Sequence, residues 1–78
     1  MSVAGTRAFD VILRPEPEGG FTVRVPAFPE IVTFGEDEVE ALAMAREAIE
    51  LVIEDRTARG EPIPEPNTIR LRTVSVAA

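Results

Sequence analysis

The sequence predicts an α+β domain in which one mostly antiparallel sheet is covered on one face by a single long helix. Three short strand-like segments with alternating apolar residues precede residue 35. A stretch without Gly or Pro follows at 38–59, and a further strand-like segment comes at 68–76. The order β-β-β-α-β lets the sheet and the helix bury their apolar faces against each other. We therefore expect residues 1–78 to form one domain.

The first three strands are expected at residues 7–14, 21–25 and 31–34. The first is rich in β-branched and aromatic residues, and the second alternates apolar with polar residues, as a half-buried strand does. Between them, residues 15–20 contain two prolines, which cannot donate to a strand ladder, and two glycines, which permit positive φ. This composition favours a hairpin loop. The prolines within 26–29 indicate an edge or a connection before the third strand.

The helix is expected at residues 38–59. Asp37 is a good N-cap residue, and Glu40 three positions later completes an Asp-x-x-Glu capping box. Gly60 stands where a residue in the left-handed conformation commonly ends a helix. The apolar side chains recur with helical spacing and form one stripe that can face a sheet. The centre of that stripe is formed by Leu42, Ala45, Ile49, Val52 and Ile53.

The apolar arc of this helix is wider than a small sheet needs. Met44 and Leu51 extend it along one flank, where they form either the margin of the core or an interface, and we favour the interface. The opposite side is acidic. An acidic helix face is most often simply solvated, but it can also attract a basic partner. The acidic residues that we expect in such an interface are Glu47, Glu50 and Glu54.

The connector after the helix, residues 61–66, has a proline at every second position, which predicts a stiff and extended segment. The last strand is expected at 68–76, with Arg70 and Arg72 on the face opposite its apolar residues. Two arginines without an aromatic platform are weak evidence for RNA binding. We expect them to pair with acidic neighbours or with a second subunit.

The composition excludes most catalytic chemistry. The chain contains no His, Cys or Lys, so it offers no imidazole base, no thiolate nucleophile, no ordinary zinc site and no Schiff base. We therefore expect a protein that is not an enzyme and that has no catalytic residues, no cofactor and no metal. With 14 acidic residues against 8 arginines, the net charge is −6. This balance favours a basic protein partner over nucleic acid or an anionic membrane.

The sequence gives no sign of export or of membrane insertion. Its N-terminus has no continuous apolar region of the kind that a signal peptide contains. No apolar run approaches the roughly 18 residues that would cross a bilayer. We therefore expect a cytoplasmic protein.

An ordered set of short motifs from Phe9 to Val76 resembles the HicB-like antitoxin domain family. The motifs are Glu18-Gly19-Gly20-Phe21-Thr22-Val23, Pro26-Ala27-Phe28-Pro29, Thr33-Phe34-Gly35-Glu36-Asp37, Glu40-Ala41 with Ala45-Arg46-Glu47-Ala48-Ile49-Glu50, and Gly60-Glu61-Pro62-Ile63-Pro64-Glu65-Pro66. The resemblance implies a partial ribonuclease H-like fold whose last strand lies parallel beside the first. It also implies a prokaryotic protein that binds and masks HicA, a small basic toxin that cleaves messenger RNA, and that forms a homodimer or a larger homo-oligomer.

The sequence departs from the family pattern in two respects. Where relatives usually have Asp, Gly and Cys between the second and third strands, this chain has Ala27, Glu30 and Ile31. Many relatives also carry a C-terminal DNA-binding segment, and none follows Ala78 here. We therefore expect a short, solitary member of the family that does not bind an operator directly.

Two alternatives to the antitoxin interpretation remain open. One is an orphan domain without a toxin partner. The other is a degenerate metal-dependent nuclease that uses Asp10 on the first strand, because two-metal hydrolysis requires converging carboxylates. A cross-strand ion pair between Asp10 and Arg24 is the simpler explanation of that aspartate.

Overall fold

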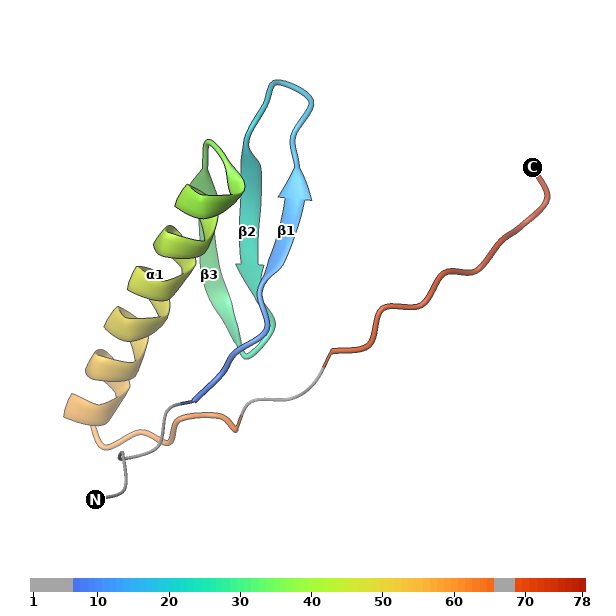
Figure 1. The fold of residues 1–78 in the computed structure, drawn as a ribbon. Coiled ribbons are helices and arrows are strands. Elements are labelled where there is room, and N and C mark those ends of the chain that lie inside the picture. Colours follow the sequence, from blue (N-terminus) through green and yellow to red (C-terminus); the bar gives the residue numbers. More distant parts are fainter. Residues whose placement is uncertain (1–6, 66–68) are drawn as a thin grey trace, which may run out of the picture.

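The computed structural model describes residues 7–65 and 69–78. Its secondary structure is a three-stranded antiparallel sheet followed by one helix: β1 Ile12–Pro15, β2 Phe21–Val25, β3 Phe28–Gly35 and α1 Glu38–Ala58. The strand order is β1-β2-β3. The helix lies across one face of the sheet, mainly over β2 and β3 (Figure 1). The predicted α+β class and the order β-β-β-α are confirmed.

The β1–β2 hairpin closes through a tight loop. The backbone N–H of Glu16 donates to the Gly20 carbonyl at 3.0 Å, and the Gly19 N–H donates to the Glu16 carbonyl at 3.0 Å. Gly20 has φ of 81°, and a Cβ there would collide with the ring of Phe34. Glycine is therefore required both for the backbone conformation and for the close approach of the loop to β3.

The first strand is shorter than predicted. Pairing begins at Ile12, opposite Arg24, and β2 ends one residue later at Val25. The expected strand at 7–14 is therefore wrong in its first half. Residues 7–10 extend past the end of β2, and Val11, which the register places opposite Val25, is not part of the strand. This overhanging segment still contributes to the core, since Phe9 packs against Phe28 with ring centroids 5.3 Å apart.

The third strand is longer than the predicted 31–34, since it begins at Phe28 and includes Pro29. The register between β2 and β3 shifts at Arg24 and Val25, which brings Phe28 opposite Val25. A proline is acceptable there because β3 is an edge strand, so its missing N–H need not serve a neighbour. Pro29, which led to the prediction of a later strand start, lies within β3, and Pro26 lies in the turn before it.

The start of α1 matches the prediction closely. Asp37 has extended backbone angles, and its Oδ1 accepts a hydrogen bond from the Glu40 N–H at 2.8 Å. Glu40 Oε1 accepts in return from the N–H of Glu36 at 2.7 Å, one residue before the cap. Two N–H groups at the helix start are thus satisfied by side chains.

The end of α1 lies one residue before the predicted boundary. The Gly60 N–H donates to Thr57 O at 3.1 Å and the Glu61 N–H donates to Arg56 O at 2.8 Å, with Gly60 at φ of 72°. This is the Schellman arrangement, in which a left-handed glycine follows the last cap residue.

The core is small and lies between α1 and two strands. Its buried residues form two groups, one of Val23, Ala41 and Ala45 and the other of Val25, Phe28 and Ile31. Small side chains on α1 allow the helix to approach the sheet closely, and a Cβ on Gly35 would collide with the backbone of Ala41. Leu42 was expected at the centre of the buried stripe but is 46% exposed. The helix is thus rotated so that its alanines face the sheet.

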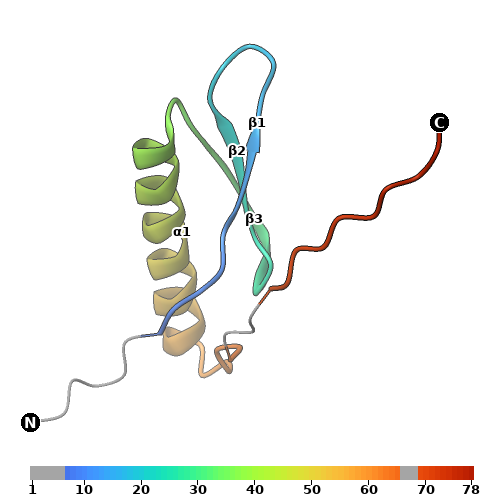
Figure 2. The ribbon, with the colours of Figure 1, turned by 45° about the vertical axis from the view of Figure 1, so that its right-hand side comes forward.

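The predicted last strand at 68–76 is not formed in the single chain. Residue 68 lies outside the described residues, and residues 69–78 have no regular secondary structure. This segment runs away from the sheet in both views (Figures 1 and 2). The segment carries a strand-like sequence, but a strand forms only where a partner supplies its hydrogen bonds.

Candidate protein-interaction surfaces

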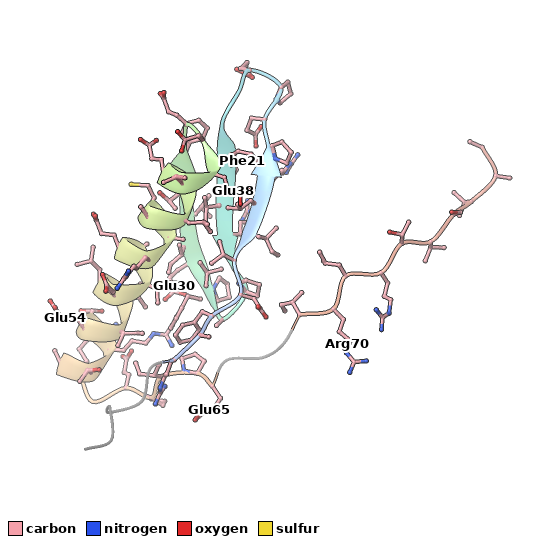
Figure 3. The ribbon with its side chains drawn as sticks, viewed as in Figure 1. Phe21, Glu30, Glu38, Glu54, Glu65 and Arg70 are labelled. Carbon is pink, nitrogen blue, oxygen red and sulfur yellow. The ribbon has the colours of Figure 1, made fainter. Side chains whose placement is uncertain are left out.

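The acidic side of α1 is exposed to solvent. Glu47, Glu50 and Glu54 are all exposed. Arg46 lies 3.6 Å from Glu50, but both side chains are more than 60% exposed, so this ion pair stabilises the helix little. Within residues 7–65 and 69–78, neither Glu47 nor Glu54 forms an ion pair. Figure 3 shows Glu54 pointing away from the sheet. The helix therefore presents negative charge to solvent.

The apolar flank of α1 is partly exposed. Met44 is 37% exposed and Leu51 is 58% exposed. They stand seven residues apart, which places them on the same side of the helix about two turns from each other. This flank borders the acidic side chains, so an apolar surface and a charged surface lie next to each other on one helix.

Arg70 and Arg72 do not join the helix surface. Both lie on the extended segment after the proline-rich connector, and both are exposed. Figure 3 shows Arg70 on the opposite side of the molecule from Glu54. The residues proposed for an interface from the sequence therefore fall into two separate surfaces.

An open groove lies between α1 and the segment that precedes β1. It has a volume of about 650 Å³ and separates the segment before β1 from the helix. Phe9 and Val11 form one wall, while Leu42, Ile49 and Ile53 form the other. Leu42, Ile49 and Ile53 were expected at the centre of the stripe that faces the sheet, but they also line this open groove.

The outer face of the sheet carries a third apolar surface, which the sequence analysis missed. Ile12 is 44%, Val32 is 54% and Phe34 is 47% exposed. Ile12 and Val32 flank Arg24 in the strand register. The alternation along each strand could have predicted this surface, because these residues point to the face of the sheet opposite the buried residues.

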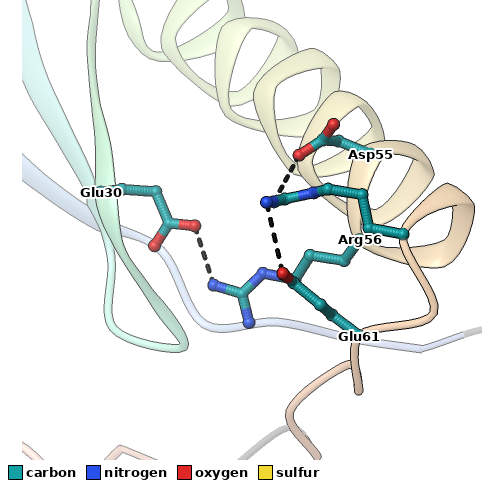
Figure 4. Close-up of polar contacts among 5 residues, drawn as sticks. Glu30, Asp55, Arg56 and Glu61 are labelled. Carbon is teal, nitrogen blue, oxygen red and sulfur yellow. Dashed lines mark hydrogen bonds and ion pairs between the residues drawn. The ribbon is translucent and has the colours of Figure 1, made fainter.

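A cluster of charged residues ties the end of α1 to β3 (Figure 4). The Arg56 guanidinium lies 2.8 Å from Glu30 Oε2 and 5.1 Å from the centre of the Phe28 ring. Arg59 contacts Asp55 at 2.6 Å and Glu61 at 3.2 Å. Backbone hydrogen bonding at Glu30, together with Arg56, lowers the pKa of the Glu30 carboxyl from its usual value. The contact of Arg56 with Glu30 and Phe28 fixes the end of the helix against β3.

Asp10 does not pair with Arg24. Its Oδ2 accepts a hydrogen bond from the backbone N–H of Ile69 at 2.8 Å, and Arg24 stands opposite Ile12 instead. Among the described residues, no three acidic side chains converge in a way that could hold a metal ion. In the same part of the chain, no helix has the length and apolar character needed to cross a membrane.

The chain resembles known proteins over most of its length. Residues 9–75 match the family model described as "HicB_like antitoxin of bacterial toxin-antitoxin system". A protein named Antitoxin HicB 1, from Photorhabdus laumondii, is 38% identical over 61 residues, which are 78% of this chain and 39% of that protein. A protein named UPF0150 protein Ta0767, from Thermoplasma acidophilum, is 37% identical over 59 residues, which are 76% of this chain and 86% of that protein.

The family match, over residues 9–75, spans the hairpin, the third strand and the whole of α1, which are the elements that build the surfaces described above. Family membership supports an antitoxin role for a chain that presents an acidic and partly apolar helix. On this evidence the chain belongs to the HicB-like antitoxin family of bacterial toxin–antitoxin systems.

Proposed function

We propose that the chain is a non-enzymatic interaction module that binds and masks a small, basic, HicA-like toxin that cleaves messenger RNA. The observation that carries this proposal is the exposed α1 surface, in which Glu47 and Glu54 adjoin Met44 and Leu51. Negative charge steers a basic partner, and apolar contacts then hold it. Because messenger RNA is a cytoplasmic target, the pair would act in the cytoplasm.

The family match and the net charge of −6 support this proposal. A messenger-RNA-cleaving toxin must bind phosphates and is therefore expected to be cationic. An acidic chain can compete for the same cationic surface and so exclude RNA without any catalysis of its own. Direct nucleic-acid binding by this chain forms no part of the proposal.

Co-expression with the product of the neighbouring gene tests the masking role. A basic neighbour that co-purifies with the chain and whose RNA cleavage is inhibited by it is the expected result. The double variant Glu47→Arg with Glu54→Arg should weaken the complex at least tenfold, and the binding of the unmodified chain should fall as salt rises. Glu18→Arg and Glu65→Arg together make the matched control, since both sites are exposed and lie off the helix.

Equal binding by the helix variant and the control would contradict the proposed surface. If the product of the neighbouring gene does not bind this chain and does not cleave RNA, the result would favour an orphan domain that acts without a toxin.

Self-association forms a second part of the proposal. Leu51 is more than half exposed on the flank of α1, as a subunit interface would require. Leu51→Glu should leave the helix formed and lower the mass observed by sedimentation. Thr57→Glu, at an exposed position of the same helix, provides the control. An unchanged mass for Leu51→Glu would remove this residue from the interface.

A further inference from the structure

One face of the sheet is covered by α1, and no helix or strand of residues 7–65 and 69–78 covers the other (Figure 1). The strand register arranges the outward side chains of that second face in two rows, each of which crosses all three strands. The outer sheet face consists of the row Ile12, Arg24 and Val32 and the row Arg14, Thr22 and Phe34. A partner that approaches this face therefore meets side chains and not backbone groups.

Three of the six positions on the outer sheet face hold exposed apolar side chains, which are Ile12, Val32 and Phe34. The ring of Phe34 lies against the hairpin loop, where a Cβ on Gly20 would collide with it. A side chain that is already held in place loses less conformational freedom when a partner binds. Neighbouring apolar side chains on a surface, bordered by polar ones, are typical of an interaction site.

The outer sheet face also carries unpaired positive charge. Arg14 and Arg24 are exposed, and neither forms an ion pair within residues 7–65 and 69–78. They are diagonal neighbours across the β1–β2 ladder, about 7–8 Å apart. Glu16 reaches this face, but its Oε2 accepts a hydrogen bond from Thr22 Oγ1 at 2.6 Å. With the two arginines set aside, the net charge of −6 becomes −8 for the remainder of the chain.

This combination of side chains favours an acidic protein partner. A guanidinium group binds a carboxylate through two parallel hydrogen bonds, and arginine and aromatic residues are common anchors of protein interfaces. A basic protein would be repelled by Arg14 and Arg24. A polynucleotide would suit the arginines, but Ile12 and Val32 offer it no stacking surface, and the acidic remainder of the chain repels phosphates.

The form of the partner follows from which groups are exposed. A strand joins a sheet through backbone groups at an edge, whereas an amphipathic helix covers a face through its side chains. On a helix, residues three or four apart lie on the same side, about 5–6 Å from each other. Two carboxylates with this spacing can reach the two arginines while apolar residues between them contact the sheet.

A second copy of this chain also has an acidic helix, but its position does not allow a closed pair. The acidic side of α1 points away from the sheet, as Glu54 shows in Figure 3, so it lies on the opposite side of the molecule from the outer sheet face. Docking of α1 onto the outer sheet face of another copy would be a head-to-tail contact, which forms a ring or an open filament. A one-to-one complex therefore requires a helix from a different protein.

We infer that the outer sheet face is a second binding site, which takes an acidic amphipathic helix of another protein. Apolar side chains of that helix pack against Ile12, Val32 and Phe34, and its carboxylates pair with Arg14 and Arg24. The site lies on the other side of the molecule from the acidic side of α1, so the chain can bind a basic and an acidic partner at once. The inference goes beyond the masking of a toxin and does not depend on it.

A labelled helical peptide of about 20 residues is the probe, since shorter helices are marginal in water. It carries leucines along one side and glutamates on both flanks of that side, and a second peptide has glutamine in place of every glutamate. In fluorescence anisotropy with the full-length chain, we expect the glutamate peptide to bind at least fivefold more tightly, and added salt to remove this difference. Equal affinities at low salt would overturn the inference.

Substitution of the two arginines tests which residues bind the carboxylates. Arg14→Gln with Arg24→Gln should weaken binding of the glutamate peptide at least fivefold. Arg46→Gln with Arg59→Gln is the control, because it removes the same charge from exposed positions on the helix side of the molecule. Circular dichroism should show the same helix content in both double variants. The inference fails if both weaken the peptide equally.

Amide chemical shifts of the isotopically labelled, unmodified chain locate the peptide without any substitution. The changes should centre on the six residues of the outer sheet face. Changes centred on α1, or on the groove beside Phe9, would overturn the inference.

Two further measurements identify other occupants. Displacement of the peptide by a uridine oligonucleotide would show a nucleic-acid site and overturn the inference. An oligomer of the chain alone that Arg14→Gln with Arg24→Gln dissociates in sedimentation would show a second copy as the occupant and do the same. A chain that binds the peptide but no toxin would leave the inference intact and contradict only the proposed function.

Discussion

Replacement of Phe28 by alanine provides the sharpest test of how this small domain is held together. Phe28 is 0% exposed, and its ring contacts both Phe9 and Arg56. A fully buried aromatic side chain removes about 200 Å² from water. At about 25 cal/mol per Å², that burial contributes about 5 kcal/mol, and measured Phe→Ala losses in cores are about 3–5 kcal/mol.

Phe34 allows a matched comparison with the same chemical change. It lies on the outer face of the sheet and is 47% exposed, so roughly half as much area is lost when it is truncated. Phe34→Ala should therefore cost about 2 kcal/mol, near half the cost at Phe28. A domain of this length is expected to have a total stability of about 4–12 kcal/mol, so Phe28→Ala removes a large share of it.

Urea unfolding followed by circular dichroism at 222 nm measures both changes. If Phe28→Ala does not fold in water, Phe28→Leu supplies the measurement. It retains most of the apolar volume, loses the ring contacts and should cost about 1–1.5 kcal/mol. Equal free-energy losses for the alanine variants at positions 28 and 34 would refute the assignment of Phe28 to the core and of Phe34 to the surface.

Three further predictions concern single contacts. Gly35→Ala should destabilise the fold by about 1–3 kcal/mol, because the new Cβ would collide with the backbone of Ala41 and push β3 away from α1; a melting temperature equal to that of the unmodified chain would contradict this. Asp37→Ala should cost about 0.5–2 kcal/mol by removing the acceptor at the helix start, and urea unfolding measures that loss. The lowered pKa of Glu30 means that its pairing with Arg56 stabilises the fold above the ordinary carboxyl pKa and is lost as the pH falls through the lowered folded-state value. Unfolding free energies between about pH 6 and pH 2 should therefore fall less steeply for Glu30→Gln than for the unmodified chain, and parallel pH profiles would rule this contribution out.

Two kinds of candidate interaction surface are present, and they differ in how readily the sequence reveals them. The acidic face of α1 follows directly from helical spacing, because residues three, four and seven apart share a side. The groove between Phe9 and the helix cannot be predicted from spacing, because it depends on the lateral position of α1 over β2 and β3. A helix centred over β1 would have filled the groove and closed the core.

The sequence by itself determined the parts of the fold whose interactions are local. The start of α1 depends on Asp37 and its end on Gly60, and both signals act within one helical turn. The hairpin loop likewise depends on Gly19 and Gly20, whose positive φ suits a tight turn. The charge of the helix face is also readable directly, because it requires only the spacing of the glutamates.

The tertiary structure decided every feature that depends on a distant partner. β1 begins at Ile12, opposite Arg24 and one residue before the end of β2, and β3 begins at Phe28 because a register shift brings it opposite Val25. Leu42 is half exposed because α1 turns its alanines to the sheet. The segment 69–76 has a sequence typical of a strand, but no strand among the described residues pairs with it. The physical reason is that a helix makes its hydrogen bonds within itself, whereas a strand must find them on another segment.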